Sequence, residues 1–254
     1  MRDYLLFRLA GPLASWGGPA AGELRSSQDH PTRSALLGLI GAALGLDRSA
    51  QRDHDALSEQ LHIAVAMVRS GHLITDYHTT QTPGGARGRG LPTRRDELRH
   101  SSINTILSQR QYYCDQVITV ALWNKSGALE HHTLEGLVSA LTSPHWTLYL
   151  GRKSCPLSAP PEPQIVRAEH LADALHRTRF ESDAWLSIKP GKRTHVYWDA
   201  SATPDMIGID VAMSAMRRDE PRHRTRWHFD NREESMGLLS FGSNSTRGEH
   251  HVPE

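Results

Sequence analysis

The stretch "HPTRSALLGLIGAALGL", residues 30–46, joins a short polar loop to an apolar run that contains three glycines. Its apolar side chains recur at helical spacing, which predicts a core helix with Ser34 as N-cap and Gly45 as C-cap. The run is much shorter than the roughly 20 residues that a membrane-spanning helix needs. Its glycines match neither a dinucleotide-binding pattern nor a P-loop, so we expect no nucleotide cofactor.

The polar entrance to this helix is the part that could bind a ligand. His30, Thr32, Arg33 and Ser34 lie where backbone N–H groups are unpaired and the helix dipole is positive. Such an entrance is suited to an anion. The apolar half is expected to pack in the core, where its glycines let a neighbouring strand or helix approach closely.

Outward from this helix, runs of β-forming residues and one further helix predict the rest of the core. Strands are expected over residues 4–10, 61–69, 116–123 and 146–151, and a second helix over residues 133–143. This order is the βαββαβ pattern of a ferredoxin-like or RRM-type domain, which belongs to the α+β class. An RRM binds RNA on the open face of its sheet, although the fold alone hosts many functions.

Two segments do not fit this core. Residues 71–111 have no sustained hydrophobic period, and a loop this long in a compact domain is usually functional or disordered. A proline-rich stretch at residues 155–164 predicts a domain boundary. The predicted divisions are an RRM-like domain over 1–155, a linker over 156–163 and a small β-rich domain over 164–254. That domain is expected to have strands at "WLSIK", "THVYW" and "TRWHF" and a frayed tail from Ser243.

Formal net charge is only +1, yet arginine is concentrated in two segments. Residues 81–113 hold six arginines against two acidic residues, a net charge of +4. Residues 216–232 hold six arginines against three acidic residues, a net charge of +3. Guanidinium groups fork onto phosphates and stack on bases, so both segments are candidates for nucleic-acid contact. A solvated charged surface is the alternative for each segment.

The sequence predicts neither secretion nor metal binding. Cys114 and Cys155 are far apart and lack a zinc-binding spacing, so both are expected to be reduced and structural. Asp3 and Arg8 interrupt the apolar N-terminus, which therefore does not match a signal peptide, and a cytoplasmic location is expected. The sixteen histidines include no H-E-x-x-H pattern, so no metal ion is implied.

Three motifs combine cationic side chains with aromatic or hydroxyl ones. Residues 76–95, "DYHTTQTPGGARGRGLPTRR", suit an arm that follows a nucleic-acid backbone, where arginine neutralises phosphate and flat side chains stack on bases. Residues 110–115, "RQYYCD", return this arm to the third strand. Residues 148–157, "LYLGRKSCPL", place two cations and a hydroxyl after a strand, as a phosphate or sugar contact. A disordered arm, core tyrosines and a solvated strand end are the alternatives.

Six motifs taken together resemble the CasD family, the RAMP-superfamily subunits of the type I-E CRISPR Cascade. They are "YLLFRLAGPLASWG", "HPTRSALLGLIGAALGL", "DYHT", "RQYYCD", "TVALW" and "LYLGRKSCPL", and they agree in order and spacing over about residues 1–160. The resemblance implies an RRM-type domain with a long thumb at about residues 77–111 and a small C-terminal domain. It also implies a non-catalytic subunit that caps the 5′ handle of crRNA during antiviral defence.

The resemblance also implies a set of partners. Besides crRNA, these are an adjacent backbone subunit, reached by the thumb, and the large subunit that reads the PAM, with target DNA contacted only indirectly and no membrane involved. Relatives in subtype I-C cleave precursor RNA, so a metal-independent endoribonuclease that uses His30 or His78 is the alternative function. A protein–protein adaptor whose arginines face acidic partners is a third possibility.

The residues expected to contact RNA fall into three groups. The sequence-independent grip on the backbone is assigned to Arg87, Arg89, Arg94, Arg95, Arg110, Arg152 and Lys153. Pockets for splayed bases are assigned to Trp16, His30, Arg33, Tyr77 and Tyr113. Thr32, Ser34, His78 and Ser154 complete the RNA-binding set, and neither catalytic nor metal-binding residues are predicted.

Overall fold

A seven-stranded sheet, in which every neighbouring pair of strands is antiparallel, organises the body of the protein. The structure is a computed structural model that describes residues 1–18, 22–84, 93–99, 102–128, 131–188 and 193–241. In spatial order the strands are β10 (Gln164–Ala168), β1 (Arg2–Ala10), β9 (Val117–Asn124), β6 (Leu61–Arg69), β11 (Arg193–Asp199), β13 (His228–Ser240) and β12 (Met213–His223). The two edges of the sheet are therefore β10 and β12.

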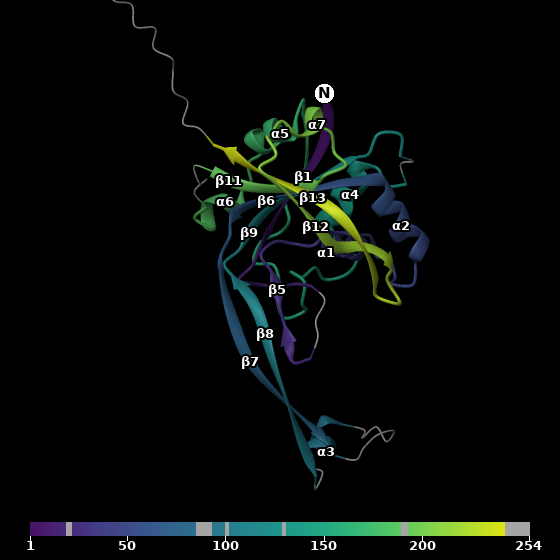
Figure 1. Ribbon diagram of the computed structural model, residues 1–254, viewed down its shortest axis with the longest axis vertical. Helices are drawn as coiled ribbons and strands as arrows, with labels where there is room; N and C mark the ends of the chain where they lie inside the picture. Colours follow the sequence, from purple (N-terminus) through teal and green to yellow (C-terminus); the bar gives the residue numbers. More distant parts are fainter. Residues whose placement is uncertain (19–21, 85–92, 100–101, 129–130, 189–192, 242–254) are drawn as a thin grey trace, which may run out of the picture.

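Helices cover both faces of this sheet (Figure 1). The helices of the body are α1 (Arg33–Leu44), α2 (Gln51–Gln60), α4 (Leu134–Thr142), α5 (Leu171–Arg177), α6 (Ser182–Trp185) and α7 (Pro204–Ile207), whereas α3 (Arg94–Leu98) lies away from the sheet, at the far end of the molecule. Side chains of β1 alternate between two cores: Leu5 and Phe7 pack with α1 and α4, and Tyr4 and Leu6 pack with α5 and α7. Because α5 and α7 cover the face that an RRM leaves open, this fold does not offer an open sheet face to RNA.

Most of the predicted core elements are confirmed. The strands expected at residues 4–10, 61–69 and 116–123 are β1, β6 and β9, and the two expected helices are α1 and α4. The strand expected at residues 146–151 is wrong. This stretch is a turn in which Leu150 N–H donates to the carbonyl of Cys155, and β10 takes the place beside β1. Its apolar alternation arises because Leu148 and Leu150 are buried in the first core from a loop.

The N-cap of α1 lies two residues before the predicted one, whereas the C-cap is the predicted residue. Thr32, rather than Ser34, is the N-cap, because its Oγ1 accepts a hydrogen bond from Ala35 N–H at 3.2 Å. Ser34 lies inside the first turn, with its hydroxyl 3.1 Å from that of Thr32. Gly45 is confirmed as the C-cap, since it has a left-handed φ of 77° and donates its N–H to Ala42.

A long antiparallel hairpin, β7 (His72–Pro83) and β8 (Ile103–Cys114), projects from the body (Figure 1). Its register runs from His72 opposite Cys114 to Pro83 opposite Ile103, and we call residues 72–114 the thumb. The long loop expected over residues 71–111 is therefore wrong for most of its length. Both strands are exposed over much of their length, so no buried face requires the hydrophobic alternation that reveals a strand.

The C-terminal part of the chain continues the same sheet, since β11 pairs with β6. Of the strands expected there, "THVYW" is confirmed as β11, whereas "WLSIK" begins in α6 and "TRWHF" spans the turn into β13. The division into residues 1–155, 156–163 and 164–254 stays a prediction about which parts fold independently. The tail from Ser243 lies outside the described residues. No helix among the described residues is long and apolar enough to cross a membrane.

Candidate nucleic-acid interface

The loop that follows β1 wraps around the base of the thumb. Its short strands are β2 (Leu13–Ala14), β3 (Trp16–Gly17), β4 (Leu24–Arg25) and β5 (Ser27–Gln28). The end of β8 pairs antiparallel with β2 and in parallel with β4. We call this junction, which consists of residues 13–18, 22–28, 109–116 and 149–155, the thumb root.

Three arginines from separate segments meet at the thumb root. Arg25 on β4 is the register partner of Arg110 on β8. Arg152 donates from Nη2 to the carbonyl of Arg25 at 3.1 Å and from Nη1 to that of Gln111 at 3.3 Å. The guanidinium of Arg152 also lies 4.7 Å from the centre of the Tyr112 ring. A guanidinium has five N–H donors, so these bonds orient Arg152 and leave donors for a phosphate.

Further polar side chains surround these arginines. Lys153 and Ser154 are exposed on the same turn as Arg152, and Tyr113 is half-buried on β8, opposite Ala14. Burial raises the pKa of Tyr113, and the nearby Asp29 raises it further, so the phenol stays neutral and can donate a hydrogen bond. The structure therefore brings five of the predicted residues to the accessible part of the thumb root. They are Arg110, Tyr113, Arg152, Lys153 and Ser154.

Arg33, in contrast, lies inside the protein and is only 2% exposed. Its Nη1 donates to Asp199 at 2.6 Å, and its Nε lies 2.8 Å from Glu220. Nη2 donates to the carbonyls of Ser58 and Leu61. Because Arg33 joins α1 to β11 and β12 through these bonds, its placement favours a structural role over contact with RNA.

Arg33 belongs to a larger set of buried charges under the C-terminal strands. Arg232 donates to Asp219 at 2.7 Å and to Glu234 at 2.6 Å, and it reaches Asp199 at 3.2 Å. Arg217 donates to Glu234 at 2.9 Å. We call this set the buried ion cluster, and its members are Arg33, Asp199, Arg217, Asp219, Arg232 and Glu234. Each of its acidic residues has at least two cationic partners.

His30 extends this cluster to the entrance of α1. It is 6% exposed, its Nδ1 lies 2.6 Å from Asp29 and its Nε2 lies 2.8 Å from Glu234, and its ring stacks on Tyr197. Burial lowers the pKa of His30, but the bonds to the two carboxylates outweigh burial and raise it. For Glu234 burial acts in the opposite direction and raises the pKa. The hydrogen bond and charge of His30 and the charges of Arg217 and Arg232 outweigh burial and lower the pKa of Glu234 to about 2. Thr32, as the N-cap, and Ser34 lie beside this group.

Trp16, expected to stack on a base, is instead buried in the thumb root. Its indole N–H donates to Gln116 Oε1 at 2.7 Å. The amide of Gln116 in turn donates to the carbonyls of Asp29 at 2.6 Å and Ser70 at 3.1 Å. Gly71 follows with a positive φ of 70°, and a Cβ there would meet the carbonyl of Cys114. These contacts fix the direction in which the thumb leaves the sheet.

The thumb exposes both polar and apolar side chains. Tyr77 is 62% exposed on β7, and His78 is half-exposed, with its ring 3.6 Å from Asp76. Arg94 pairs with Glu97 on α3, and Arg95 is exposed beside it. Among the described residues of the thumb, the large exposed aliphatic side chains are Leu73, Ile74, Leu98, Ile103, Ile106 and Leu107. Arg87 and Arg89 lie outside the described residues.

The sequence pattern of the family described as "CRISPR-associated protein (Cas_Cas5)" matches residues 4–233, which is most of the chain. The chain belongs to the Cas5 family. This Cas5-family protein is 40% identical to the CRISPR system Cascade subunit CasD of Escherichia coli (strain K12) over 161 aligned residues. The aligned region covers 63% of this chain and 70% of CasD. The resemblance to CasD that the six sequence motifs predicted is confirmed.

Solved structures agree with this Cas5 assignment. A chain of a "CRISPR RNA-guided surveillance complex" superposes with a TM-score of 0.65 and 24% identity, over 93% of this chain and 90% of that one. A second, the "Crystal structure of Cas protein", superposes with a TM-score of 0.58 and 25% identity, over 93% of this chain and 95% of that one. The mixed α/β architecture with its mostly antiparallel sheets is thus shared with Cas proteins.

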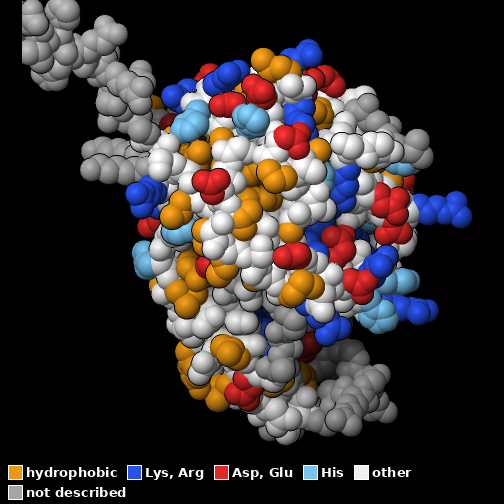
Figure 2. Space-filling model, turned by 45° about the horizontal axis from the view of Figure 1, so that its top comes forward, with side chains coloured by type: hydrophobic (Ala, Val, Ile, Leu, Met, Phe, Trp, Pro, Cys, Tyr) orange, Lys and Arg blue, Asp and Glu red, His pale blue; other side chains and the backbone are white. Residues whose placement is uncertain are grey.

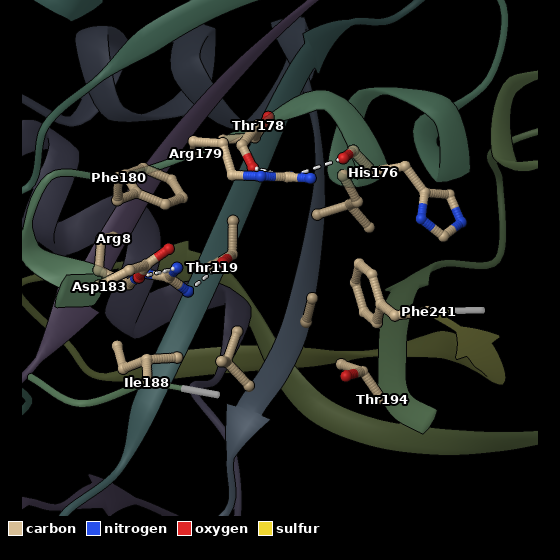
Figure 3. A pocket seen from close by; sticks show the side chains of 13 residues that line it. Arg8, Thr119, His176, Thr178, Arg179, Phe180, Asp183, Ile188, Thr194 and Phe241 are labelled. Atoms are coloured by element: carbon tan, nitrogen blue, oxygen red, sulfur yellow. Dashed lines mark hydrogen bonds and ion pairs between the residues drawn. The ribbon is translucent and has the colours of Figure 1, made fainter. Parts of the chain in front are cut away.

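This Cas5-family protein also has a cavity of about 340 Å³ on the α5 side of the sheet (Figure 3). On one wall Arg8, which is 4% exposed, donates to Thr119 at 2.6 Å and to Asp183 of α6 at 2.5 Å. Its guanidinium lies 4.2 Å from the centre of the Phe180 ring. Burial lowers the pKa of Arg8, and Asp183 opposes that shift. This ion pair ties α6 to β1 and explains how the sheet accommodates a buried cation.

The two histidines named for a cleavage reaction do not share a site. His30 is buried at the entrance to α1, whereas His78 is on the thumb strand β7. Within the described ranges, no group of three His, Cys, Asp or Glu side chains could hold a metal ion.

The sequence analysis missed two residues of the thumb root, Arg25 and Gln116. The signal for Arg25 is a lone cation in the Gly/Ser-rich loop after the first strand. Gln116, whose amide joins three segments, carries no comparable signal in the sequence.

Proposed function

We propose that this protein is a non-catalytic, RNA-binding subunit of a type I-E CRISPR Cascade and that its thumb root caps the 5′ handle of crRNA. The observation that carries the proposal is the convergence of Arg25, Arg110 and Arg152 from three segments. Arginine forks match phosphate geometry, and a cluster of them grips a backbone without reading its sequence. Membership of the Cas5 family and the likeness to CasD support this assignment.

The rest of the thumb root suits a single-stranded handle. Tyr113 offers a neutral phenol for hydrogen bonding or stacking, and Lys153 and Ser154 extend the polar surface. Single-stranded RNA with splayed bases is recognised by such combinations of cations and aromatic rings. Of the residues predicted for base pockets, Tyr77 and Tyr113 keep an accessible surface.

The proposed partners follow from the surfaces that remain. The exposed apolar side chains of the thumb suit a neighbouring protein, and we assign them to the backbone subunit of the complex. We further propose a contact with the large PAM-reading subunit, a cytoplasmic location and a ferredoxin-like core. The spatial order β10-β1-β9-β6, in which β9 separates the parallel strands β1 and β6, supports that core.

The proposal is tested with the double variant Arg110→Gln/Arg152→Gln, purified together with the other Cascade subunits. The matched control is Arg167→Gln/Arg177→Gln, which removes two exposed cations from β10 and α5. We expect the thumb-root variant to retain less crRNA, with a salt dependence shallower by about 0.7 per lost contact in log–log slope. Full crRNA content and an unchanged slope would contradict the proposal.

A second assay separates the non-catalytic role from RNA cleavage. The placement of His30 and His78 supports a subunit without nuclease activity. Incubated with cognate repeat RNA in EDTA, the protein is expected to leave the RNA intact. Site-specific cleavage that His30→Ala or His78→Ala abolishes would establish the endoribonuclease instead.

A further inference from the structure

The second basic segment, residues 216–232, is not used by the proposed handle site. It forms the outer half of the β12–β13 hairpin, and three of its six arginines are engaged with carboxylates. Arg217 and Arg232 belong to the buried ion cluster, and Arg222 pairs with Asp230 at 2.5 Å. All three acidic residues of the segment form ion pairs with arginines, because Asp219 pairs with Arg232, Asp230 with Arg222 and Glu220 with Arg33.

The other three arginines, Arg218, Arg224 and Arg226, have no carboxylate partner among the described residues. Arg218 Nε donates to a backbone carbonyl, and Arg218 and Arg226 are exposed. A fourth cation joins them, because Arg48, which follows α1, donates to the carbonyl of Arg224 at 2.8 Å. Burial lowers the pKa of Arg224, and the charge of Arg48 lowers it more than Asp55 or Glu220 raises it. The hairpin tip therefore holds more positive charge than its carboxylates balance.

An aromatic side chain stands among these cations. Trp227, at the turn, is 66% exposed, and the guanidinium of Arg48 lies 3.9 Å from the centre of its ring. The tip is held on the body, since Gln51 of α2 accepts from Arg224 N–H and donates to the carbonyl of Arg222. An exposed indole beside unpaired arginines, on a turn that is already fixed, is typical of a preformed surface for nucleic acid.

The hairpin tip is separate from the thumb root. Figure 1 places the tip beside α2, on the opposite side of the body from the base of β7 and β8. Figure 2 shows Lys, Arg and His side chains on this same side of the body, with Asp and Glu side chains between them. A short single-stranded handle that is bound at the thumb root does not account for a second cationic surface at the hairpin tip.

We propose that the β12–β13 tip, through the exposed side chains of Arg218, Arg226 and Trp227, binds the sugar–phosphate backbone of double-stranded DNA. Exposed arginines without carboxylate partners can neutralise phosphates on the outside of a duplex while the tip stays on the body, whereas single-stranded RNA is usually held in a groove or on a flat stacking surface. The inference rests on the proposed place of this protein in a complex that engages target DNA. It goes beyond that function because it assigns a direct DNA contact to this chain.

The test uses the assembled, crRNA-loaded complex and a duplex DNA without a matching target. The variant is Arg218→Gln/Arg226→Gln, and the matched control is Arg167→Gln/Arg177→Gln at the other edge of the sheet. We expect the variant to bind the duplex roughly tenfold more weakly at about 0.1 M salt and to lower the log–log salt slope by about 0.9 per phosphate contact. Trp227→Ser is expected to weaken binding without changing the slope.

Each outcome decides the proposal. An unchanged dissociation constant and slope for the double variant, relative to the control, would overturn it. Loss of crRNA at unchanged duplex affinity would also overturn it, because the tip would then contact RNA. Failure of the handle proposal is seen separately, since that proposal predicts RNA loss from Arg110→Gln/Arg152→Gln and not from the tip variant.

Discussion

Two long antiparallel hairpins of this protein, β7–β8 and β12–β13, are both rich in arginine, yet their arginines differ in burial and in carboxylate partners. The thumb projects from the body, and its Arg94 pairs with Glu97 only at the surface. The C-terminal hairpin lies in the main sheet, where Arg217 and Arg232 form ion pairs within the buried ion cluster. The number of arginines in a segment therefore does not give the number that are available to a ligand, because packing decides which of them already have carboxylate partners.

The largest expected effect comes from breaking the buried ion cluster. Arg33→Met leaves Asp199 and Glu220 without this partner, and removing one member of a buried pair costs about 3–5 kcal/mol. Unfolding by denaturant measures the loss. The matched substitution on the thumb, Arg95→Met, is expected to change the free energy of unfolding by less than about 0.5 kcal/mol. Equal losses for the two variants would contradict the contrast between the buried ion cluster and the surface of the thumb.

A smaller effect is expected from pH. The pKa of Glu234 is about 2 in the folded protein, against 4.5 for an ordinary glutamate, so its contribution, of order 3 kcal/mol, is complete above pH 4.5 and is lost as pH falls towards 2. His30 has a raised pKa, so its contribution is complete below pH 6.5 and is lost as pH rises through the folded value. These two groups therefore favour greatest stability between pH 4.5 and 6.5.

The free energy of unfolding at about pH 3, 5.5 and 8 checks this dependence. Glu234→Gln is expected to be less stable at pH 5.5 and to lose less on acidification to pH 3 than the parent protein. An identical acid dependence in parent and variant would show that Glu234 is not the group that titrates.

The smallest effect on stability is expected from the apolar surface of the thumb. Ile103→Ser/Ile106→Ser changes two exposed side chains on a projecting hairpin, so the melting temperature of the isolated protein is expected to stay within about 2 °C. Assembly with the backbone subunit is expected to weaken tenfold or more, because exposed apolar side chains gain their burial only in the complex. Native mass spectrometry of the reconstituted complex measures this. Normal stoichiometry at low protein concentration would contradict the partner assignment.

The sequence predicted the core elements because burial leaves a readable period in β1, β6, β9, α1 and α4. It did not predict the thumb strands, since a hairpin exposed on both faces needs no apolar alternation. It placed a strand at residues 146–151 because buried leucines of a turn imitate one. In each case the spacing of apolar residues along the sequence indicates which side chains are buried, and it does not by itself indicate the backbone conformation.

The site was predictable in part for the same reason. Arg110, Tyr113 and Arg152 were identified from their composition and position, and the fold brings them together. His30 and Arg33 have the same polar character in the sequence, but their carboxylate partners Glu234 and Asp199 lie about 170–200 residues away. Only the tertiary pairing of β11, β12 and β13 with the rest of the sheet shows that these two side chains are engaged.

The proposed handle site is tested most directly by finding where the crRNA handle contacts this chain. The measurement is photo-crosslinking of the assembled complex with 4-thiouridine in the 5′ handle, followed by mass spectrometry of the crosslinked peptides. We expect crosslinks to residues 109–114 and 152–154 of the thumb root and none to residues 30–34. Crosslinks to residues 30–34, with none at the thumb root, would contradict the proposed handle site.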